Sequence, residues 1–210
     1  MLDDAYVIVV TGAKNAGKTA FGYYLLQVYH ERKWRVCTMP YKKIPSKLLP
    51  PWIEQTDPMQ PELQEGTVYL LDDFHLAHHA RTGYRSEQMS CNKIMSIARH
   101  LEMKFIITTQ ITRQLDIANI WDIDIHFLRK PALGHVKAER QDVQSRARTA
   151  QRYFQRQMKE GADPQTLVYF FTTDEEGSIE DIPLPEFWTE DLSTYLRGIK
   201  RRRRRIEVTA

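Results

Sequence analysis

One stretch of the sequence has residue types and spacing that could bind a nucleotide. Residues 12–19 read GAKNAGKT and match the pattern G-x-x-x-x-G-K-[ST]. Gly12 and Gly17 allow a tight loop whose backbone N–H groups converge on phosphate oxygens. We expect Lys18 to reach the β- and γ-phosphates and the Thr19 hydroxyl to bind Mg²⁺. The residues predicted to hold the nucleotide are Gly12, Asn15, Ala16, Gly17, Lys18, Thr19 and Ala20.

Two carboxylates follow an apolar run further along the chain. Residues 68–73 read VYLLDD, which has the form of a Walker B strand. Asp72 is predicted to hold the metal through water, and Asp73 to orient or deprotonate the attacking water. Many hydrolysing ATPases carry Glu at the second position, and Asp is one methylene shorter. Alternatively, Asp73 is a helix cap or a loop residue.

Polar residues also follow a third apolar run. Residues 105–110 read FIITTQ, in which Thr108, Thr109 and Gln110 come after the apolar residues. If this strand lies beside the one that ends at Asp72, Thr109 or Gln110 can hydrogen-bond the γ-phosphate or the lytic water. The alternative is ordinary polarity at the end of a strand.

Alternating strands and helices are predicted around these motifs. Buried strands are expected over 5–11, 34–40, 67–73, 104–110, 122–129 and 166–173. Helices are expected over 20–33, 86–101, 136–160 and 185–198. In the first helix, the i, i+3, i+4, i+7 spacing of Phe21, Tyr24, Leu25 and Val28 indicates an amphipathic helix. The pattern predicts an α/β fold with a mostly parallel sheet and helices on both faces, and the proline-rich residues 41–66 an irregular excursion.

Composition indicates one soluble domain of 210 residues, of which 42% are hydrophobic and 27% charged. No apolar run approaches the length of a membrane span, and the acidic start of the chain predicts no signal peptide. Cys37 and Cys91 are expected to be buried thiols in a reducing compartment. We therefore expect a single domain over 1–198, followed by a basic tail over 199–210.

Positive charge gathers near the end of the chain, in Arg197 and, within the tail, in Lys200 and Arg201 to Arg205. These cations either bind the phosphates of a nucleic acid or form a solvated terminus. The predicted helix over 136–160 places Arg148, Arg152 and Arg156 on one face, near Arg146. That face could contact phosphates, an acidic surface of a neighbouring subunit, or only water. The histidines in FHLAHH (His75, His78 and His79) are interpreted as loop residues beside the site and not as a metal site.

The order of these motifs resembles the FtsK–HerA superfamily of DNA-pumping ATPases. The motifs are GAKNAGKT, YLLDD at 69–73, SIARH at 96–100, FIITTQ and the strand over 122–129. The chain is particularly similar to the small genome-packaging ATPases of membrane-containing icosahedral viruses with double jelly-roll capsid proteins. The resemblance covers about residues 5–130 and implies a RecA/ASCE-like P-loop NTPase fold.

The resemblance also implies roles for individual residues. Gln110 would sense the γ-phosphate and couple it to DNA-contacting loops. Arg99 is the leading candidate for an arginine finger that acts on the nucleotide of a neighbouring subunit, with Arg113 and Arg129 as alternatives. Asp73 departs from the family, in which Glu is usual, and this leaves the geometry of water activation open.

Together these observations predict an ATP- and Mg²⁺-dependent motor that moves double-stranded DNA into a preformed capsid. It would assemble as a homo-oligomeric ring, a pentamer or hexamer, in the host cytoplasm or with the virion. It would not be an integral membrane protein, and a contact with a capsid or membrane vertex protein stays open. One alternative is a nucleoside or nucleotide kinase with an arginine-bearing lid from 41–66 or 136–160. The other is a phage morphogenesis or secretion ATPase, of a kind that typically carries a membrane segment.

Overall fold

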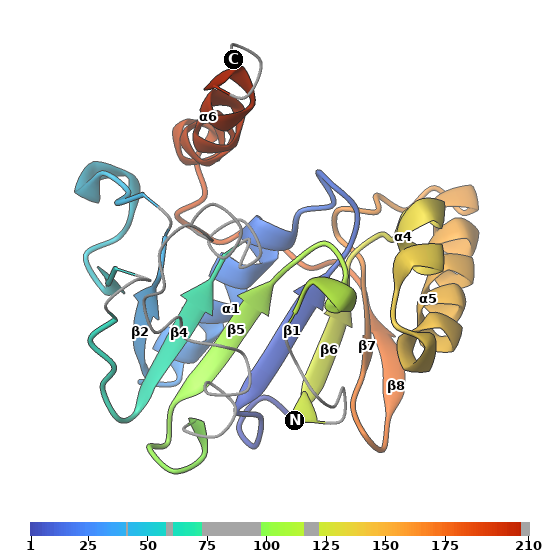
Figure 1. Ribbon diagram of the computed structural model, residues 1–210, viewed down its shortest axis with the longest axis horizontal. Helices are drawn as coiled ribbons and strands as arrows, with labels where there is room; N and C mark the ends of the chain where they lie inside the picture. Colours follow the sequence, from blue (N-terminus) through green and yellow to red (C-terminus); the bar gives the residue numbers. More distant parts are fainter. Residues whose placement is uncertain (41, 58–60, 73–97, 116–121, 207–210) are drawn as a thin grey trace.

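A computed structural model describes the chain except for residues 41, 58–60, 73–97, 116–121 and 207–210. In the described part, eight strands form one sheet in the order β3-β2-β4-β5-β1-β6-β7-β8 (Figure 1). The strands are β1 Val7–Thr11, β2 Arg35–Thr38, β3 Ile53–Gln55, β4 Thr67–Leu71, β5 Lys104–Thr108, β6 Ile125–Leu128, β7 Val168–Phe171 and β8 Glu176–Ile179. The helices are α1 Lys18–Glu31, α4 Leu133–Ala138, α5 Gln141–Lys159 and α6 Glu190–Ile206, with 3-10 turns η1 Ser46–Leu48 and η2 Thr112–Gln114.

The centre of the sheet is parallel and buried on both faces. β1 pairs with β5 on one side and β6 on the other, and β5 also pairs with β4. All residues of β1, β4 and β5 are buried, which explains their continuous apolar sequences. The prediction that the FIITTQ strand lies beside the strand ending at Asp72 is confirmed. Because these strands are parallel, the segments after β1, β4 and β5 emerge at one edge of the sheet.

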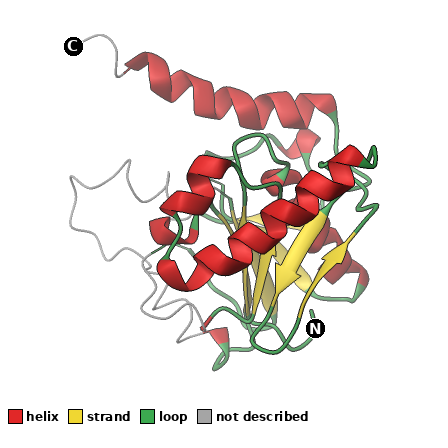
Figure 2. Cartoon of the chain, turned by 90° about the vertical axis from the view of Figure 1, so that its right-hand side faces the viewer, coloured by secondary structure: helices red, strands yellow, loops and turns green. Residues whose placement is uncertain are grey.

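Two core layers cover the two faces of the sheet. On one face, residues of α1 and α6, such as Leu26 and Leu192, pack with Ile8 of β1. On the other, Phe154 of α5 belongs to the same cluster as Val9 of β1. Neighbouring residues of β1 thus serve opposite layers, as the alternation of a strand requires. Figure 2 shows α5 lying along the outer side of the sheet.

The edges of the sheet differ from the sequence expectation. β7 lies within the predicted strand 166–173, but it runs antiparallel to β6 and forms a hairpin with β8. β8 has the sequence EGSI and is mostly exposed, so it carries no apolar pattern. β3 lies in the proline-rich residues 41–66, for which the sequence predicts an irregular excursion, and it pairs with β2 in parallel.

The helices also depart in detail from their predictions. In α1, Phe21 and Leu25 are buried as expected, but Tyr24 and Val28 are only partly buried. Tyr23, which lies outside the predicted apolar stripe, is buried instead, because the C-terminal segment covers it: its ring lies 6.1 and 5.9 Å from the Phe187 and Trp188 rings. The predicted helix 136–160 is two helices, α4 and α5, separated at residues 139–140.

The C-terminal helix is longer than expected and includes most of the basic run. α6 continues past the predicted end at residue 198, so the backbone of Arg201 to Arg205 is helical. In Figures 1 and 2 it lies beyond the edge of the sheet at which the parallel strands end. Of the predicted helix 86–101, residues 86–97 lie outside the described part. Across the described residues, no helix combines the length and the apolar character needed to cross a bilayer.

Candidate nucleotide-binding site

The loop of residues 12–17 joins β1 to α1 and depends on its glycines. Gly12 has φ 149°, and a Cβ there would lie 2.9 Å from both the Cβ and the carbonyl oxygen of Arg129. Gly17 caps the helix with φ 79°, and Asn15 also has a positive φ, of 64°. These left-handed conformations suit Gly and Asn best. The Gly12 N–H donates to the Gln110 carbonyl at 3.3 Å, which fixes the start of the loop beside the end of β5.

Lys18 lies against this loop. Its side chain is buried, and its Nζ donates to the carbonyl oxygens of Gly12 and Ala13 at 3.1 and 2.9 Å. A lysine held at the start of α1 adds a full positive charge to the partial charge of the helix N-terminus. The combination suits the phosphate chain of a nucleotide.

The two predicted metal ligands meet at the edge of the sheet. The Thr19 hydroxyl donates to both carboxylate oxygens of Asp72, at 2.9 and 3.2 Å. The Thr108 hydroxyl donates to the Asp72 Oδ1 at 2.7 Å, so the carboxylate is oriented from two sides. A hydroxyl and a carboxylate are hard oxygen ligands, and these residues therefore fit Mg²⁺.

The contact between Thr19 and Asp72 depends on the close packing of α1 on the sheet. A Cβ on Gly22 would lie 2.8 Å from the Leu70 Cδ1 and 3.2 Å from the Thr108 Cγ2. A side chain at this position would force the buried Leu70 side chain to shift, so the glycine lets α1 approach β4 and β5 closely. Sequence reasoning identified neither Gly22 nor Thr108 as part of the site. The only signals were a glycine inside a helical pattern and a second threonine in FIITTQ.

Gln110 and Thr109 occupy different environments. Thr109 is fully buried, and its hydroxyl donates to the Ile111 carbonyl at 3.5 Å. Gln110 is half-buried, and within the described part of the chain its side chain makes no hydrogen bond. Because its carbonyl accepts from Gly12, Gln110 is next to the phosphate loop. Its sensing role stays a prediction, for which Gln110 is the better placed of the two residues.

The candidate arginine fingers lie in three settings. Arg99 pairs with Asp124 at 2.8 Å, and Asp124 accepts the backbone N–H of Tyr6 and Val7 at the amino end of β1. Arg99 is therefore at the opposite edge of the sheet from its own phosphate loop, and its action on a neighbour stays a prediction. Arg113 is exposed in the turn after Gln110.

Arg129 is not available to a neighbouring subunit, which corrects its place among the candidates. Its side chain is 2% exposed. Its Nε donates to the Ala16 carbonyl at 3.0 Å, its Nη2 donates to the Gln165 carbonyl, and the guanidinium lies 5.4 Å from the centre of the Phe21 ring. Burial lowers the pKa of Arg129 to about 10. Arg129 therefore supports the phosphate loop of its own subunit.

Glu139 is a buried carboxylate that sequence reasoning missed. Both of its oxygens accept the backbone N–H of Thr112, at 3.1 and 3.0 Å, and it also accepts the Thr112 hydroxyl. Burial raises the pKa of Glu139, while these hydrogen bonds lower it. Glu139 thus fixes the turn that follows Gln110 to the junction between α4 and α5.

Several predicted residues lie outside the described part of the chain. They are Asp73, His75, His78, His79 and Cys91. Cys37, in contrast, is buried on β2 as expected, and burial raises its thiol pKa to about 12.

The parallel order β4-β5-β1-β6, the glycine loop between β1 and α1 and the carboxylate after β4 define a RecA/ASCE-like P-loop NTPase fold. Among solved structures, the genome packaging NTPase B204 of Sulfolobus turreted icosahedral virus 2 is similar. Its complex with ATP-gammaS has a TM-score of 0.57 and 13% identity over 88% of this chain and 100% of that chain. Its AMPPCP complex has the same TM-score and coverage at 14% identity.

B204 of Sulfolobus turreted icosahedral virus, a DNA-packaging ATPase, gives a TM-score of 0.55 and 12% identity. That match covers 86% of this chain and 98% of the other. No protein-family model and no curated protein matches the chain. At these identities the likeness establishes the fold.

Proposed function

We propose that the protein is a Mg²⁺-dependent ATPase motor that translocates double-stranded DNA and packages a viral genome into a preformed capsid. The observation that carries the proposal is the contact of Thr19 with Asp72 beside the lysine-bearing loop. A hydroxyl and a carboxylate in contact beside this loop support a role as the ligands of a Mg·nucleotide. The similarity to B204, a genome packaging NTPase crystallised with ATP analogues, supports the substrate and the process.

Each site residue has a distinct task in this proposal. Lys18 and the backbone N–H groups of the loop would neutralise the β- and γ-phosphates. Thr19 and Asp72 would hold Mg²⁺, which when bound supplies positive charge to the phosphates that separate. Thr108 orients the Asp72 carboxylate for this task. Gln110 would contact the γ-phosphate or the water, and Asp73 would orient the water.

A ring of identical subunits would complete the site. Arg99 lies far from its own phosphate loop, so any role in catalysis would be on the nucleotide of a neighbour. Such a residue accelerates hydrolysis by about 10³-fold or more. Activity should therefore rise more steeply than in proportion to protein concentration.

Phosphate release and DNA binding test this function together. ATP hydrolysis is measured with and without duplex DNA, beside phosphate transfer to nucleosides and nucleotides. We expect DNA-stimulated hydrolysis by the wild type, none by Lys18→Ala, and DNA binding that weakens steeply between 50 and 200 mM salt. Normal turnover by Lys18→Ala refutes the site, and transfer to a nucleoside without DNA stimulation identifies a kinase instead.

A further inference from the structure

Helix α5 presents a row of cations to solvent. Arg148, Arg152, Arg156 and Lys159 are exposed, and we call them the basic face of α5. The opposite side of the helix is fixed in the core by Val143, Ala147, Ala150, Tyr153 and Phe154. The row therefore cannot turn inward, and in Figure 2 α5 lies across the front of the molecule with its outer side open.

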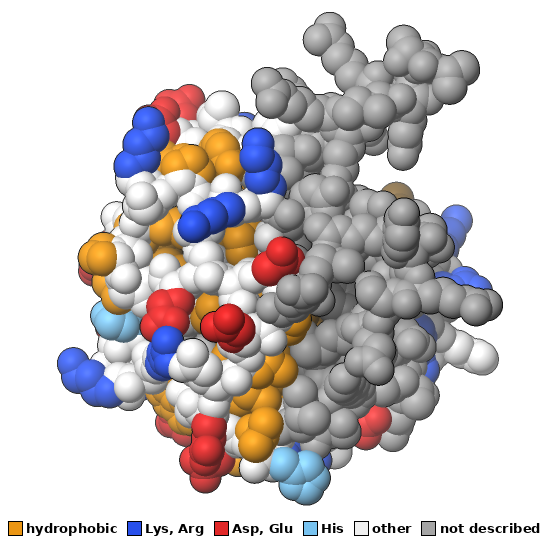
Figure 3. Space-filling view, turned by 60° about the vertical axis from the view of Figure 1, so that its left-hand side comes forward, with side chains coloured by type: hydrophobic (Ala, Val, Ile, Leu, Met, Phe, Trp, Pro, Cys, Tyr) orange, Lys and Arg blue, Asp and Glu red, His pale blue; other side chains and the backbone are white. Residues whose placement is uncertain are grey.

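The basic face has no carboxylate partner within the described part of the chain. Arg148 donates to the Gln144 side chain and Arg152 to the Thr149 hydroxyl, both at 3.3 Å, and both acceptors are neutral. The one acidic residue of α5, Asp142, pairs with Arg140 at 3.5 Å. Like charges at i, i+4 destabilise a helix by about 0.2–0.5 kcal/mol per pair. By contrast, the described side chains on the face in Figure 3 mix both charge signs.

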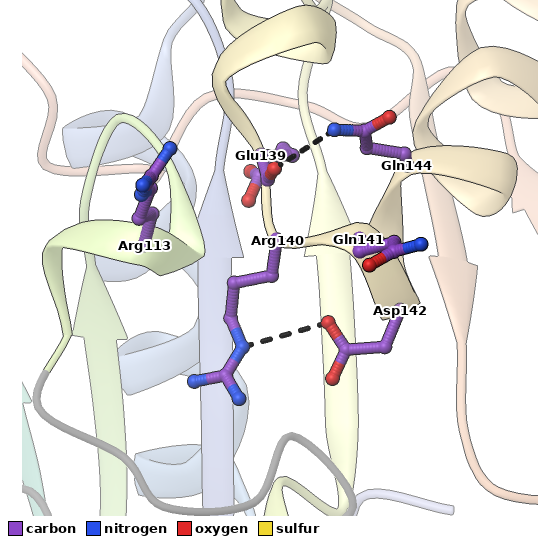
Figure 4. A pocket seen from close by; sticks show the side chains of 6 residues that line it. All are labelled: Arg113, Glu139, Arg140, Gln141, Asp142 and Gln144. Carbon is purple, nitrogen blue, oxygen red and sulfur yellow. Dashed lines mark hydrogen bonds and ion pairs between the residues drawn. The ribbon is translucent and has the colours of Figure 1, made fainter.

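The start of α5 is tied to the nucleotide site. Glu139, immediately before the N-cap Arg140, holds the backbone and hydroxyl of Thr112. Thr112 lies two residues after Gln110, whose carbonyl accepts from Gly12. A continuous set of contacts thus runs from the phosphate loop to α5. A surface pocket of about 700 Å³ lies at this junction. Figure 4 shows the side chains that line it, those of Arg113, Glu139, Arg140, Gln141, Asp142 and Gln144.

We propose that the basic face of α5 contacts the phosphate backbone of DNA, and that Glu139 positions the Gln110 turn relative to that helix so that DNA contact and hydrolysis are coupled. The inference rests on the proposed function and assigns its DNA-contacting element. Glu139 is a positioning residue here, because it reaches the site through Thr112.

The spacing of the row favours DNA over an acidic protein surface. Residues four apart on a helix are separated by about 6 Å along its axis, and the whole row extends over about 17 Å. Duplex DNA offers a phosphate charge about every 1.7 Å along its axis, so every cation of such a row can find one. Four cations spaced three or four residues apart match this uniform charge without requiring specific acidic partners.

Salt dependence tests the DNA contact. Duplex binding is measured between 50 and 200 mM salt for the wild type and for the triple variant Arg148→Gln, Arg152→Gln, Arg156→Gln. Each phosphate contact contributes about 0.9 to the slope of log K against log salt, so the slope should fall by about 2.7. Between 50 and 200 mM salt, the decrease in DNA affinity of the triple variant should therefore be about 40-fold smaller than that of the wild type. The matched control removes three exposed charges that form no ion pair with the described residues and lie towards the β2–β3 edge of the sheet, by Lys33→Gln, Lys42→Gln, Lys47→Gln, and should keep the wild-type slope.

A second measurement tests the coupling. Glu139→Gln should bind DNA with the wild-type slope but lose most of the stimulation of hydrolysis by DNA. Because Glu139 and Thr112 are both buried and a substitution there can impair folding, the nearly isosteric Thr112→Val is compared with Thr112→Ser as well. The serine keeps the hydroxyl donor and should retain stimulation, whereas the valine should lose it. A purely structural role would change thermal stability without separating binding from stimulation.

Each outcome bears on one proposal or the other. A wild type that neither hydrolyses ATP nor binds DNA refutes the proposed function. A wild type that does both, with a triple variant of unchanged slope, refutes the role of α5. A triple variant that loses its oligomeric state at unchanged slope assigns the basic face to a neighbouring subunit and also overturns the inference. Full DNA stimulation in Glu139→Gln overturns the coupling.

Discussion

His126 on β6 should make the protein sensitive to mild acid. Its ring is 2% exposed, its Nε2 lies 2.7 Å from the Thr11 hydroxyl, and it packs against the Phe171 ring at 4.6 Å. Its Nδ1 has no partner among the described residues, so a proton there would have no acceptor. Burial, together with a smaller contribution from the charge of Arg146, lowers the pKa of His126 to about 3.

The sign and size of the effect follow from proton linkage. In the unfolded chain the pKa of His126 is 6.5, so between pH 6.5 and 3 the unfolded state binds more protons than the folded state. Stability from this residue is therefore fully present above pH 6.5 and decreases as the pH falls toward 3. The loss at pH 5 is about 2 kcal/mol, and below pH 3 it approaches about 5 kcal/mol.

Urea unfolding at pH 7 and pH 5 measures this difference. Carboxylates also contribute to the acid sensitivity of any protein, so the relevant quantity is the difference between wild type and His126→Gln. Gln keeps a partner for the Thr11 hydroxyl but does not titrate. We expect the variant to lose about 2 kcal/mol less than the wild type between the two pH values. Equal losses in the two proteins would show that His126 is already protonated in the fold, or solvated there, and would refute the reasoning.

Three further predictions concern the site. Gly12→Ala should weaken nucleotide binding at least about tenfold and lower the unfolding free energy by about 1–3 kcal/mol, because its Cβ would lie 2.9 Å from the Arg129 carbonyl oxygen. The control Gly134→Ala, whose Cβ would have no atom within 4 Å, should change neither quantity. Thr108→Val should raise the Mg²⁺ concentration for half-maximal hydrolysis about 10-fold or more, and an unchanged Mg²⁺ titration would exclude its role in orienting Asp72. Arg129→Lys should weaken nucleotide binding in a calorimetric titration, since lysine cannot make both carbonyl contacts while stacking on Phe21, and wild-type affinity would contradict this.

Much of the site was predictable because its parts lie next to strong local signals. GAKNAGKT and VYLLDD each follow a continuous apolar run, and parallel strands bring their carboxyl ends to one edge. The meeting of Thr19 with Asp72 follows from that geometry. The prediction of a mostly parallel sheet with helices on both faces is confirmed for the same reason.

The missed features depend on contacts between distant residues. β8 pairs through its backbone with β7 and needs no apolar side chains, so EGSI carries no strand pattern. Glu139 lies in a long polar stretch and resembles a helix-surface residue until Thr112 is placed against it. Arg129 follows an apolar strand and could equally have been exposed. Its burial depends on the Ala16 and Gln165 carbonyls, which only the folded chain brings together.

The anchoring of the phosphate loop also determines when its conformational entropy is lost. The Gly12 and Ala13 N–H groups donate to Gln110 and Lys130, and the Ala16 carbonyl accepts from Arg129. A loop tied at three positions is ordered when the protein folds, so nucleotide binding has little backbone left to immobilise. Preorganisation of this kind raises affinity without adding a contact. We therefore expect nucleotide to associate in a single fast phase, with a binding entropy that contains little contribution from loop ordering.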